Sequence, residues 1–305
     1  MNNPQMMAQI VGGAGFVAAI DQSGGSTPNA LNALGLPPDA YADEEEMYAL
    51  MDNVRNWIMR SSVFSGRKIL AAILFERTMD ADLKGRPVPQ YLWDKGIVPF
   101  VKVDKGLADE RGGVRLMNAN PDLENVLERA ASLGVFGTKM RSLISADSVS
   151  GIRALVEQQF ETANLILERD LVPIVEPEVA IASPVRSECD RILLAELMRA
   201  LERQPHGRRV ILKLTLPVEE NLFAPLVAHP NCARVLALSG GLSQQDACAG
   251  LARNRGMIAS FSRALLQDLR AQMDHGEFNR VLGEAIDRVY RASTMKVLTS
   301  PQDGR

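Results

Sequence analysis

Eight short apolar runs, most of them separated by segments with helical spacing, constrain the fold of this chain more than any other feature of its sequence. The runs are residues 16–21, 69–75, 97–104, 135–141, 171–178, 209–217, 234–238 and 257–261. Nearly continuous apolar runs of this length are typical of parallel strands that are covered on both faces. Between them, apolar residues recur at helical spacing, as they do in residues 43–60. This alternation predicts an α/β fold, the (β/α)8 TIM barrel, with a doubly wound open sheet as the alternative.

The composition allows a large core and argues against charged polymers as partners. A chain of 305 residues, of which 46% are hydrophobic, can bury the core of one large barrel. Because no linker or low-complexity segment interrupts the pattern, we expect a single (β/α)8 barrel domain over residues 1–305. A net charge of −3 without a long basic run argues against nucleic acid or an acidic membrane surface as the main partner. These features favour a small molecule as the partner.

Cysteine and histidine usage indicates the compartment and the kind of chemistry. The three cysteines lack CxxC spacing, and the N-terminus lacks the charged and then apolar pattern of a signal peptide. No apolar run reaches the length of a membrane span, so we expect no membrane partner and a cytoplasmic protein. The three histidines lie in unrelated polar stretches without HxxxH or HxH spacing. We therefore expect no histidine-built metal site.

Lys213 is the unusual residue of the sixth run, because it interrupts a stretch that otherwise reads as buried strand. Burial favours the neutral amine, so we expect its pKa to fall below the reference value of about 10.4. A desolvated lysine can attack a carbonyl group and hold it as a Schiff base. The alternative is a lysine on an edge strand, or one whose ammonium group reaches water. Charges elsewhere in the chain decide between the two.

Charged residues stand late in four other strand-like runs as well. They are Asp21, Lys102, Lys139, Glu176 and Glu178. The active site of a (β/α)8 barrel lies at the C-terminal ends of its strands, where side chains from separate strands meet. Acids and lysines that meet there can neutralise one another, so that no charge is buried alone. The joint pattern therefore predicts a catalytic site that contains Lys213.

The last two runs end in residues that are suited to binding a phosphate group. These are Ser239, Gly240 and Gly241 after the seventh run, and Ser260, Ser262 and Arg263 at the end of the eighth. The loops after strands seven and eight are the usual phosphate site of this fold. A glycine pair alone mostly indicates a turn, but an arginine at the neighbouring strand end strengthens the interpretation. We expect the substrate to be a phosphorylated carbonyl compound.

Seven motifs follow one another along the chain: AAIDQSGGSTP, VKVDKG, GTKMR, VPIVEPE, LKLT, LSGG and SFSRAL. In this order they resemble those of the class I fructose-bisphosphate aldolases, especially the bacterial branch, over nearly the whole length. The resemblance implies reversible cleavage of fructose 1,6-bisphosphate to dihydroxyacetone phosphate and glyceraldehyde 3-phosphate. It also implies a covalent Schiff base and no cofactor. The alternatives are a Schiff-base lyase for another phosphorylated ketose, or a phosphometabolite-binding protein with weak catalysis.

The same resemblance implies a role for each catalytic candidate. Lys213 resembles the Schiff-base lysine, and Glu176 resembles the general acid/base. Glu178 and Lys139 resemble the electrostatic partners of that glutamate. Asp21 is similar to the acid that handles the C4 hydroxyl group.

For the substrate, the resemblance implies two phosphate-binding regions and a pocket between them that Lys102 lines. The residues that resemble the C1-phosphate site are Ser239, Gly240 and Arg263. Ser26 and Arg141 lie nearer the other phosphate. Family members often assemble, so the oligomeric state is open between a monomer and a homo-oligomer.

One residue departs from the family pattern and leads to a prediction. Members commonly have a basic residue where this chain has Asn29. A charge-assisted hydrogen bond to phosphate is about twice as strong as a neutral one, so Asn29→Lys should lower the KM for the bisphosphate by roughly one to two orders of magnitude. Fructose 1-phosphate lacks the second phosphate, and its KM should stay nearly constant. Steady-state kinetics with both substrates check this. Equal changes for both, or none for either, would place Asn29 outside the phosphate site.

Overall fold

The computed structural model describes residues 3–23 and 27–297, and in these residues eight parallel strands form a barrel. The strands are β1 (Phe16–Ile20), β2 (Ile69–Leu74), β5 (Val98–Lys102), β7 (Gly137–Ile144), β8 (Val172–Val179), β9 (Val210–Thr215), β10 (Cys232–Leu238) and β11 (Met257–Phe261). Each strand is hydrogen bonded to the next in this order, and β11 pairs with β1. The sheet thus returns to its first strand, which confirms the predicted TIM barrel and excludes the open doubly wound sheet.

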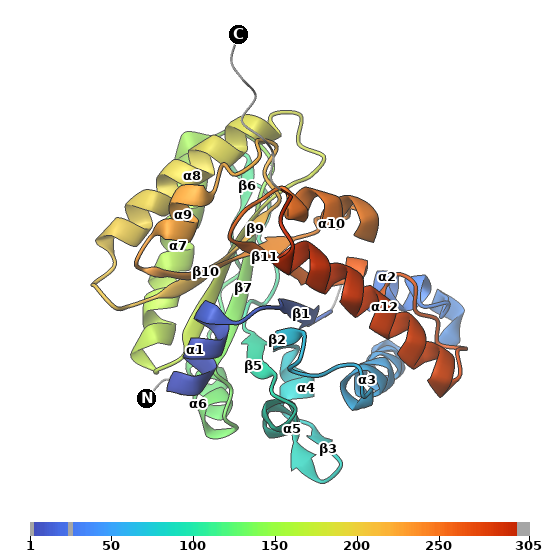
Figure 1. Cartoon of the computed structure of the whole chain (residues 1–305). Helices are drawn as coiled ribbons and strands as arrows, with labels where there is room; N and C mark the ends of the chain where they lie inside the picture. Colours follow the sequence, from blue (N-terminus) through green and yellow to red (C-terminus); the bar gives the residue numbers. More distant parts are fainter. Residues whose placement is uncertain (1–2, 24–26, 298–305) are drawn as a thin grey trace.

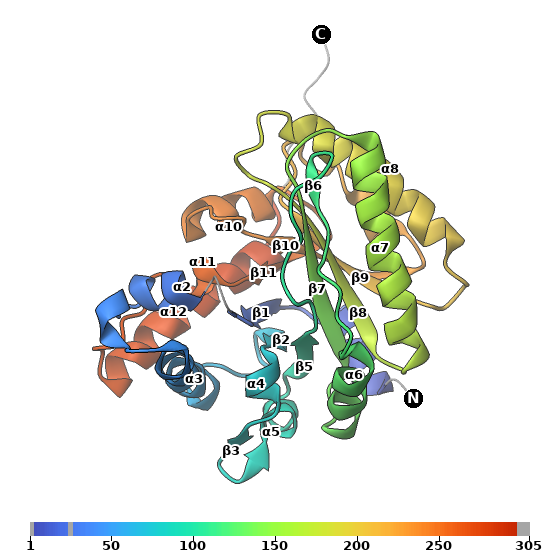
Figure 2. The ribbon, with the colours of Figure 1, turned by 180° about the vertical axis from the view of Figure 1, so that it is seen from behind.

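Helices connect the strands and surround the barrel (Figures 1 and 2). They are α1 (Pro4–Gly12), α2 (Thr27–Ala33), α3 (Glu44–Arg60), α4 (Glu76–Met79), α5 (Val88–Asp94), α6 (Leu123–Ser132), α7 (Val149–Glu168), α8 (Arg186–Arg203), α9 (Ala224–Ala228), α10 (Gln244–Ala252), α11 (Arg263–Leu266) and α12 (His275–Thr294). Side-chain caps fix where several begin. Asp43 accepts from the Glu46 N–H at the start of α3, and Ser148 and Ser243 cap α7 and α10. Such caps satisfy backbone donors that have no partner inside the helix.

Some short elements have no counterpart in the predicted pattern. A hairpin pairs β3 (Asp82–Leu83) with β4 (Arg86–Pro87), and β6 (Val114–Arg115) lies antiparallel to β7. A 3-10 turn covers Pro38–Ala40. Each has only two or three residues, which is too short for a hydrophobic period to be recognised.

Two hydrophobic clusters separate the inside of the barrel from its outside. Side chains inside the barrel include Val17, Ala19, Ile174 and Ile211, and α1 contributes Met6 and Ile10 to the same cluster. The alternate residues of the strands pack outward against the helices, as Phe16, Ala18 and Ile20 do. Because side chains alternate along a strand, the next inward positions after the apolar layer are Asp21, Glu176 and Lys213. The barrel therefore changes from an apolar layer to a charged layer along its axis.

Gly137 lets the interior close at the start of β7. A Cβ atom there would lie 2.1 Å from the Val172 carbonyl oxygen and 2.6 Å from the Phe100 ring. The Phe100 ring packs edge-on against Phe136, with ring centroids 5.5 Å apart. No side chain fits in this position, so the inward step before Lys139 has to be a glycine.

We predict that Gly137→Ala lowers the free energy of unfolding by about 3 kcal/mol, because overpacking against backbone cannot be relieved by a rotamer change. Urea unfolding at 25 °C measures it. Gly12→Ala is the matched control, since no atom lies within 4 Å of the added Cβ. That control should change the stability by less than about 1 kcal/mol, toward greater stability. Equal effects of the two substitutions would contradict the close packing at Gly137.

Asp190 on α8 anchors the chain just after β9. Its Oδ2 accepts from the Val218 N–H at 3.0 Å, while Oδ1 is buried without a partner. Arg186 donates to the Leu216 carbonyl oxygen of the same segment. Burial raises the pKa of Asp190 to about 6, against the opposing effects of the Val218 N–H and Arg186. The strand that carries Lys213 is thus tied to α8 by a carboxyl group that binds a proton more readily in the folded protein.

This raised pKa fixes the sign of a pH effect. Between the unfolded value of 3.8 and the folded value of about 6, the folded protein holds more protons at Asp190. Its stability therefore falls as pH rises through this window. Relative to Asp190→Asn, the free energy of unfolding of the native chain should fall by about 2 kcal/mol between pH 4 and pH 7. Urea unfolding of both proteins at several pH values measures this difference. A difference that stays constant with pH would rule out the raised pKa.

Candidate active site

Four buried side chains from four strand ends form a continuous chain of ion pairs inside the barrel. Lys213 Nζ lies 2.9 Å from Glu176 Oε1, and Lys139 Nζ lies 2.7 Å from Glu176 Oε2. Lys139 also donates to Asp21 Oδ2 at 3.1 Å. All four residues are between 3 and 8% exposed. Two ammonium groups and two carboxylates therefore compensate one another where water is largely excluded.

The electrostatics of this chain favour its charged form. Burial alone would raise the pKa of the Asp21 carboxyl group. The ammonium groups of Lys139, Lys213 and Lys102 outweigh burial and lower this pKa to about 2. Burial likewise lowers the pKa of the Lys139 ammonium group, but Asp21 and Glu176 raise it well above its ordinary value. Asp21 thus remains a carboxylate and Lys139 an ammonium ion at neutral pH.

Strands β8 and β9 bring Glu176 and Lys213 together. Their backbone pairing joins Ile174 to Ile211 and Val175 to Leu212. Beyond it, the buried Thr215 hydroxyl group replaces the ladder: it donates to the Val179 carbonyl oxygen at 2.8 Å and accepts from the Val179 N–H at 2.9 Å. A side-chain bridge therefore holds the two strand ends at a fixed separation, so that an amine and a carboxylate stay in contact. A pair of this kind can exchange a proton and can support attack on a carbonyl group.

Two further charged pairs lie around the chain of four. Lys102 Nζ is 2.9 Å from Asp104 Oδ1 and donates to the Asp104 carbonyl oxygen at 2.8 Å. Arg141 Nε lies 2.5 Å from Glu178 Oε2, and this carboxylate raises the pKa of the guanidinium group against the effect of burial. The structure thus brings Lys102, Arg141 and Glu178 to the same end of the barrel. Each of these three makes its printed ion pair outside the four-residue chain.

The residues that were predicted to bind phosphate lie at the ends of β10 and β11. Gly240 and Gly241 have φ angles of 58° and 106°, and a Cβ at Gly241 would lie 3.5 Å from a nitrogen of the Arg263 guanidinium group. Arg263 therefore lies beside the glycine turn that follows β10. These left-handed angles are ones that glycine adopts at no steric cost.

The predicted serines lie in different environments. Ser239, which precedes this turn, is buried, with 6% exposure. Ser260 is only 1% exposed, and its hydroxyl group has no partner among the described residues. Ser262 accepts a hydrogen bond from Gln22 at 2.7 Å. Ser26 lies outside the described residues, so its predicted contact with phosphate stays a prediction.

Several polar residues around the site could not be assigned from strand ends. Gln159 on α7 donates to the Ser142 hydroxyl group at 3.0 Å and to the Glu176 carbonyl oxygen at 3.2 Å. It is fully buried, as are its helix neighbours Leu155 and Ile152. A glutamine at a core position of a helix was the available signal, because buried amides need partners.

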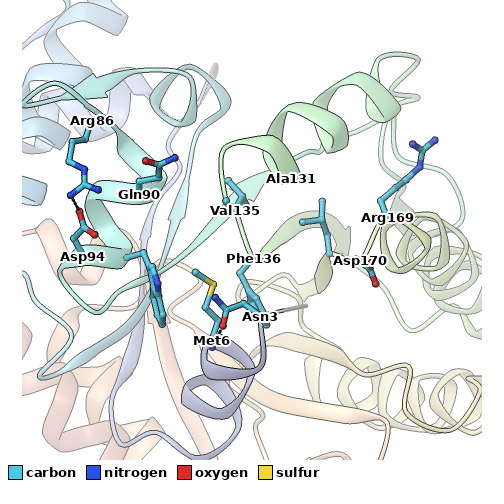
Figure 3. A pocket seen from close by; sticks show the side chains of 13 residues that line it. Asn3, Met6, Arg86, Gln90, Asp94, Ala131, Val135, Phe136, Arg169 and Asp170 are labelled. Carbon is cyan, nitrogen blue, oxygen red and sulfur yellow. Dashed lines mark hydrogen bonds and ion pairs between the residues drawn. The ribbon is translucent and has the colours of Figure 1, made fainter. Parts of the chain in front are cut away.

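A cavity of about 510 Å³ lies at the opposite end of the barrel (Figure 3). Met6 of α1 lines it together with Phe136 and Leu171, which precede β7 and β8. Arg86 and Asp94 on its wall form an ion pair with each other. None of the predicted site residues lines this cavity, so it is separate from the charged layer.

Two searches of the described residues bear on other chemistries. Within residues 3–23 and 27–297, no three histidine, cysteine, aspartate or glutamate side chains gather closely enough to hold a metal ion. In the same part of the chain, no helix has both the length and the apolar character to cross a membrane.

Structures of known proteins share this fold. The chain superposes on the fructose-bisphosphate aldolase of Plasmodium falciparum, solved with TRAP and a small-molecule inhibitor, with a TM-score of 0.74 and 19% identity over 96% of this chain and 94% of that one. An archaeal fructose-1,6-bisphosphate aldolase, in which the catalytic lysine is bound to a carbinolamine intermediate, gives a TM-score of 0.52 and 13% identity over 94% and 100% of the chains. A Schiff-base-forming fructose-1,6-bisphosphate aldolase gives 0.52 and 15% over 93% and 100%. At these identities the likeness shows the fold.

The sequence itself supplies the family. The family model described as fructose-bisphosphate aldolase class-I matches residues 5–206, which is about two thirds of the chain. This region contains β1 to β8 and therefore Asp21, Lys102, Lys139 and Glu176. The resemblance that the motifs indicated is thereby confirmed, while the bacterial branch stays a prediction. The chain belongs to the class I fructose-bisphosphate aldolase family.

Proposed function

We propose that this protein is a fructose-bisphosphate aldolase that reversibly cleaves fructose 1,6-bisphosphate to dihydroxyacetone phosphate and glyceraldehyde 3-phosphate. Class I aldolases use a lysine Schiff base and no metal. The observation that carries the proposal is the buried contact of 2.9 Å between Lys213 Nζ and Glu176 Oε1. It places a candidate nucleophile beside a group that can take its proton and later return it.

In the proposed reaction, Glu176 takes a proton from Lys213, and the free amine attacks the C2 ketone. Glu176 then protonates the carbinolamine hydroxyl group, which leaves as water. The resulting iminium ion accepts the electron pair of the C3–C4 bond as it breaks. Asp21 takes the proton of the C4 hydroxyl group, so that the aldehyde product forms. Protonation of the enamine at C3 and hydrolysis then release the ketone product and free Lys213.

The remaining predicted residues would hold the substrate. Lys139 keeps Glu176 and Asp21 in place as their shared cation. Arg263 and the glycine turn at Gly240 offer a guanidinium group and backbone N–H donors to the C1 phosphate. Ser239, Gly241, Ser260 and Ser262 belong to the same proposed region. Lys102, Arg141 and Ser26 would face the other end of the sugar, with Glu178 as the partner of Arg141.

Another phosphorylated ketose is the second candidate substrate. The identities of 13 to 19% with the solved aldolases do not carry the substrate over. Asn29 favours this alternative, since it is an exposed, uncharged residue of α2 at a position where a basic residue is common in the family. A panel of phosphorylated ketoses distinguishes the two substrates, and binding without turnover would indicate a phosphometabolite-binding protein. The cytoplasmic location and the oligomeric state stay predictions from the sequence.

Borohydride reduction in the presence of dihydroxyacetone phosphate should trap one covalent adduct, at Lys213. Lys213→Met should abolish the adduct and the cleavage activity, because no other amine lies beside Glu176 Oε1 among the described ion pairs. Peptide mass spectrometry locates the adduct, and a coupled assay measures cleavage. Lys68→Met is the matched control, since Lys68 pairs with Asp287 outside the charged layer and should keep both. An adduct at Lys102 or Lys139 with Lys213 unmodified would refute the proposal.

A further inference from the structure

Arg55 on α3 is a fully buried arginine that the proposed reaction does not use. Its exposure is 0%, and it is the largest fully buried side chain in the described residues. The guanidinium group donates through Nε to the Ile20 carbonyl oxygen at 3.0 Å and through a second nitrogen to the Gln22 carbonyl oxygen. The third nitrogen donates to Asp52 at 2.8 Å. Burying a guanidinium group is costly, so these contacts need a reason beyond space filling.

The two carbonyl groups that Arg55 binds belong to the residues on either side of Asp21. β1 ends at Ile20, so Asp21 and Gln22 lie where the sheet no longer fixes the backbone. From Asp21 the carboxylate reaches Lys139 at 3.1 Å. Arg55 therefore holds the backbone before and after the carboxylate that completes the buried chain of ion pairs.

The geometry of these contacts requires a guanidinium group. Arginine presents its donors in a rigid planar fork, whereas a lysine ammonium group is a single point on a flexible stem. One ammonium group cannot take the place of three separated nitrogens that bind Ile20, Gln22 and Asp52. Asp52 also lies 3.1 Å from Arg77 Nε, and the Arg55 guanidinium group is 5.6 Å from the centre of the Phe75 ring. The fork is thus fixed from its outer side as well.

We propose that Arg55 is a positioning residue, which fixes Asp21 through the carbonyl groups of Ile20 and Gln22 so that its carboxylate meets Lys139 and the reacting hydroxyl group. This inference rests on the proposed function for its catalytic consequence. Its structural content, the placement of Asp21 by Arg55, does not depend on the substrate. A purely structural strut would stabilise the fold and leave the catalytic step that needs Asp21 unchanged.

The test combines Arg55→Lys with Asp21→Asn in a double-mutant cycle. Arg55→Lys should form the borohydride adduct at Lys213 as the native protein does, because the Lys213 and Glu176 pair is not anchored by Arg55. Its kcat for cleavage should fall about a hundred-fold, which is the size of effect expected when a catalytic group moves by about 1 Å. In the Asp21→Asn background, Arg55→Lys should cost little further activity, because a residue that acts through Asp21 is not additive with it.

Controls separate positioning from stability. Arg234 is a partly buried arginine that donates to the Val11 and Gly13 carbonyl oxygens, near α1 and away from Asp21. Arg234→Lys should lower the melting temperature without changing kcat. Asp52→Asn, which loosens the guanidinium group and keeps Arg55, should lower kcat in the same direction as Arg55→Lys but by a smaller factor.

Two outcomes would overturn the inference. One is a loss of kcat for Arg55→Lys that is the same in the native and the Asp21→Asn backgrounds. The other is a crystal structure of Arg55→Lys in which Asp21 still lies at hydrogen-bond distance from Lys139. That structure also separates this inference from the proposed function: if the native protein formed no adduct, the function would fail, while a displaced Asp21 would still support the role of Arg55.

Discussion

The burial of two lysines with two carboxylates is the interaction on which this structure depends. Removing one partner from a buried pair leaves a charge uncompensated and costs several kcal/mol. Asp21, Lys139, Glu176 and Lys213 alternate in sign along a chain of contacts between 2.7 and 3.1 Å. They come from four strand ends, so their contacts require that the sheet close on itself. The barrel and its charged layer therefore stabilise each other: the closed sheet brings the charges together, and their pairing makes the burial tolerable.

Much of this arrangement follows from the period of a strand. Because inward positions recur every second residue, a lysine two residues beyond Ile211 must face the inside of the barrel. The eight apolar runs and the charges late in them therefore predicted both the barrel and the end at which the charges meet. The pairing partners required the register between strands, which places Lys102 beside Lys139 and Arg141 beside Glu176. No pattern within a single strand contains that information.

The residues that the sequence did not reveal hold the charged layer from outside the strand ends. Thr215 bridges two strands with its hydroxyl group, Gln159 reaches Glu176 from α7, and Arg55 reaches the end of β1 from α3. Each lies inside a pattern that also suits an ordinary strand or helix, and its partner is at least 17 positions away along the chain. A polar residue at an apolar position signals that some partner exists. The identity of the partner depends on tertiary packing, and this is why the short hairpin of β3 and β4 was missed as well.

The two buried lysines differ in a way that bears on which one can react. Lys139 lies between two carboxylates, at 3.1 Å from Asp21 and 2.7 Å from Glu176, whereas Lys213 has one carboxylate contact, with Glu176. In the proposed reaction, the charge of Lys213 has to disappear when its amine becomes free. That loss breaks a single ion pair. Glu176 still keeps Lys139 as its counter-ion after Lys213 becomes neutral, so it is not left as an isolated buried charge. The same loss at Lys139 would leave Asp21 and Glu176 as neighbouring carboxylates without the cation between them. The asymmetry of the network therefore favours Lys213 as the nucleophile and keeps Lys139 as the fixed cation.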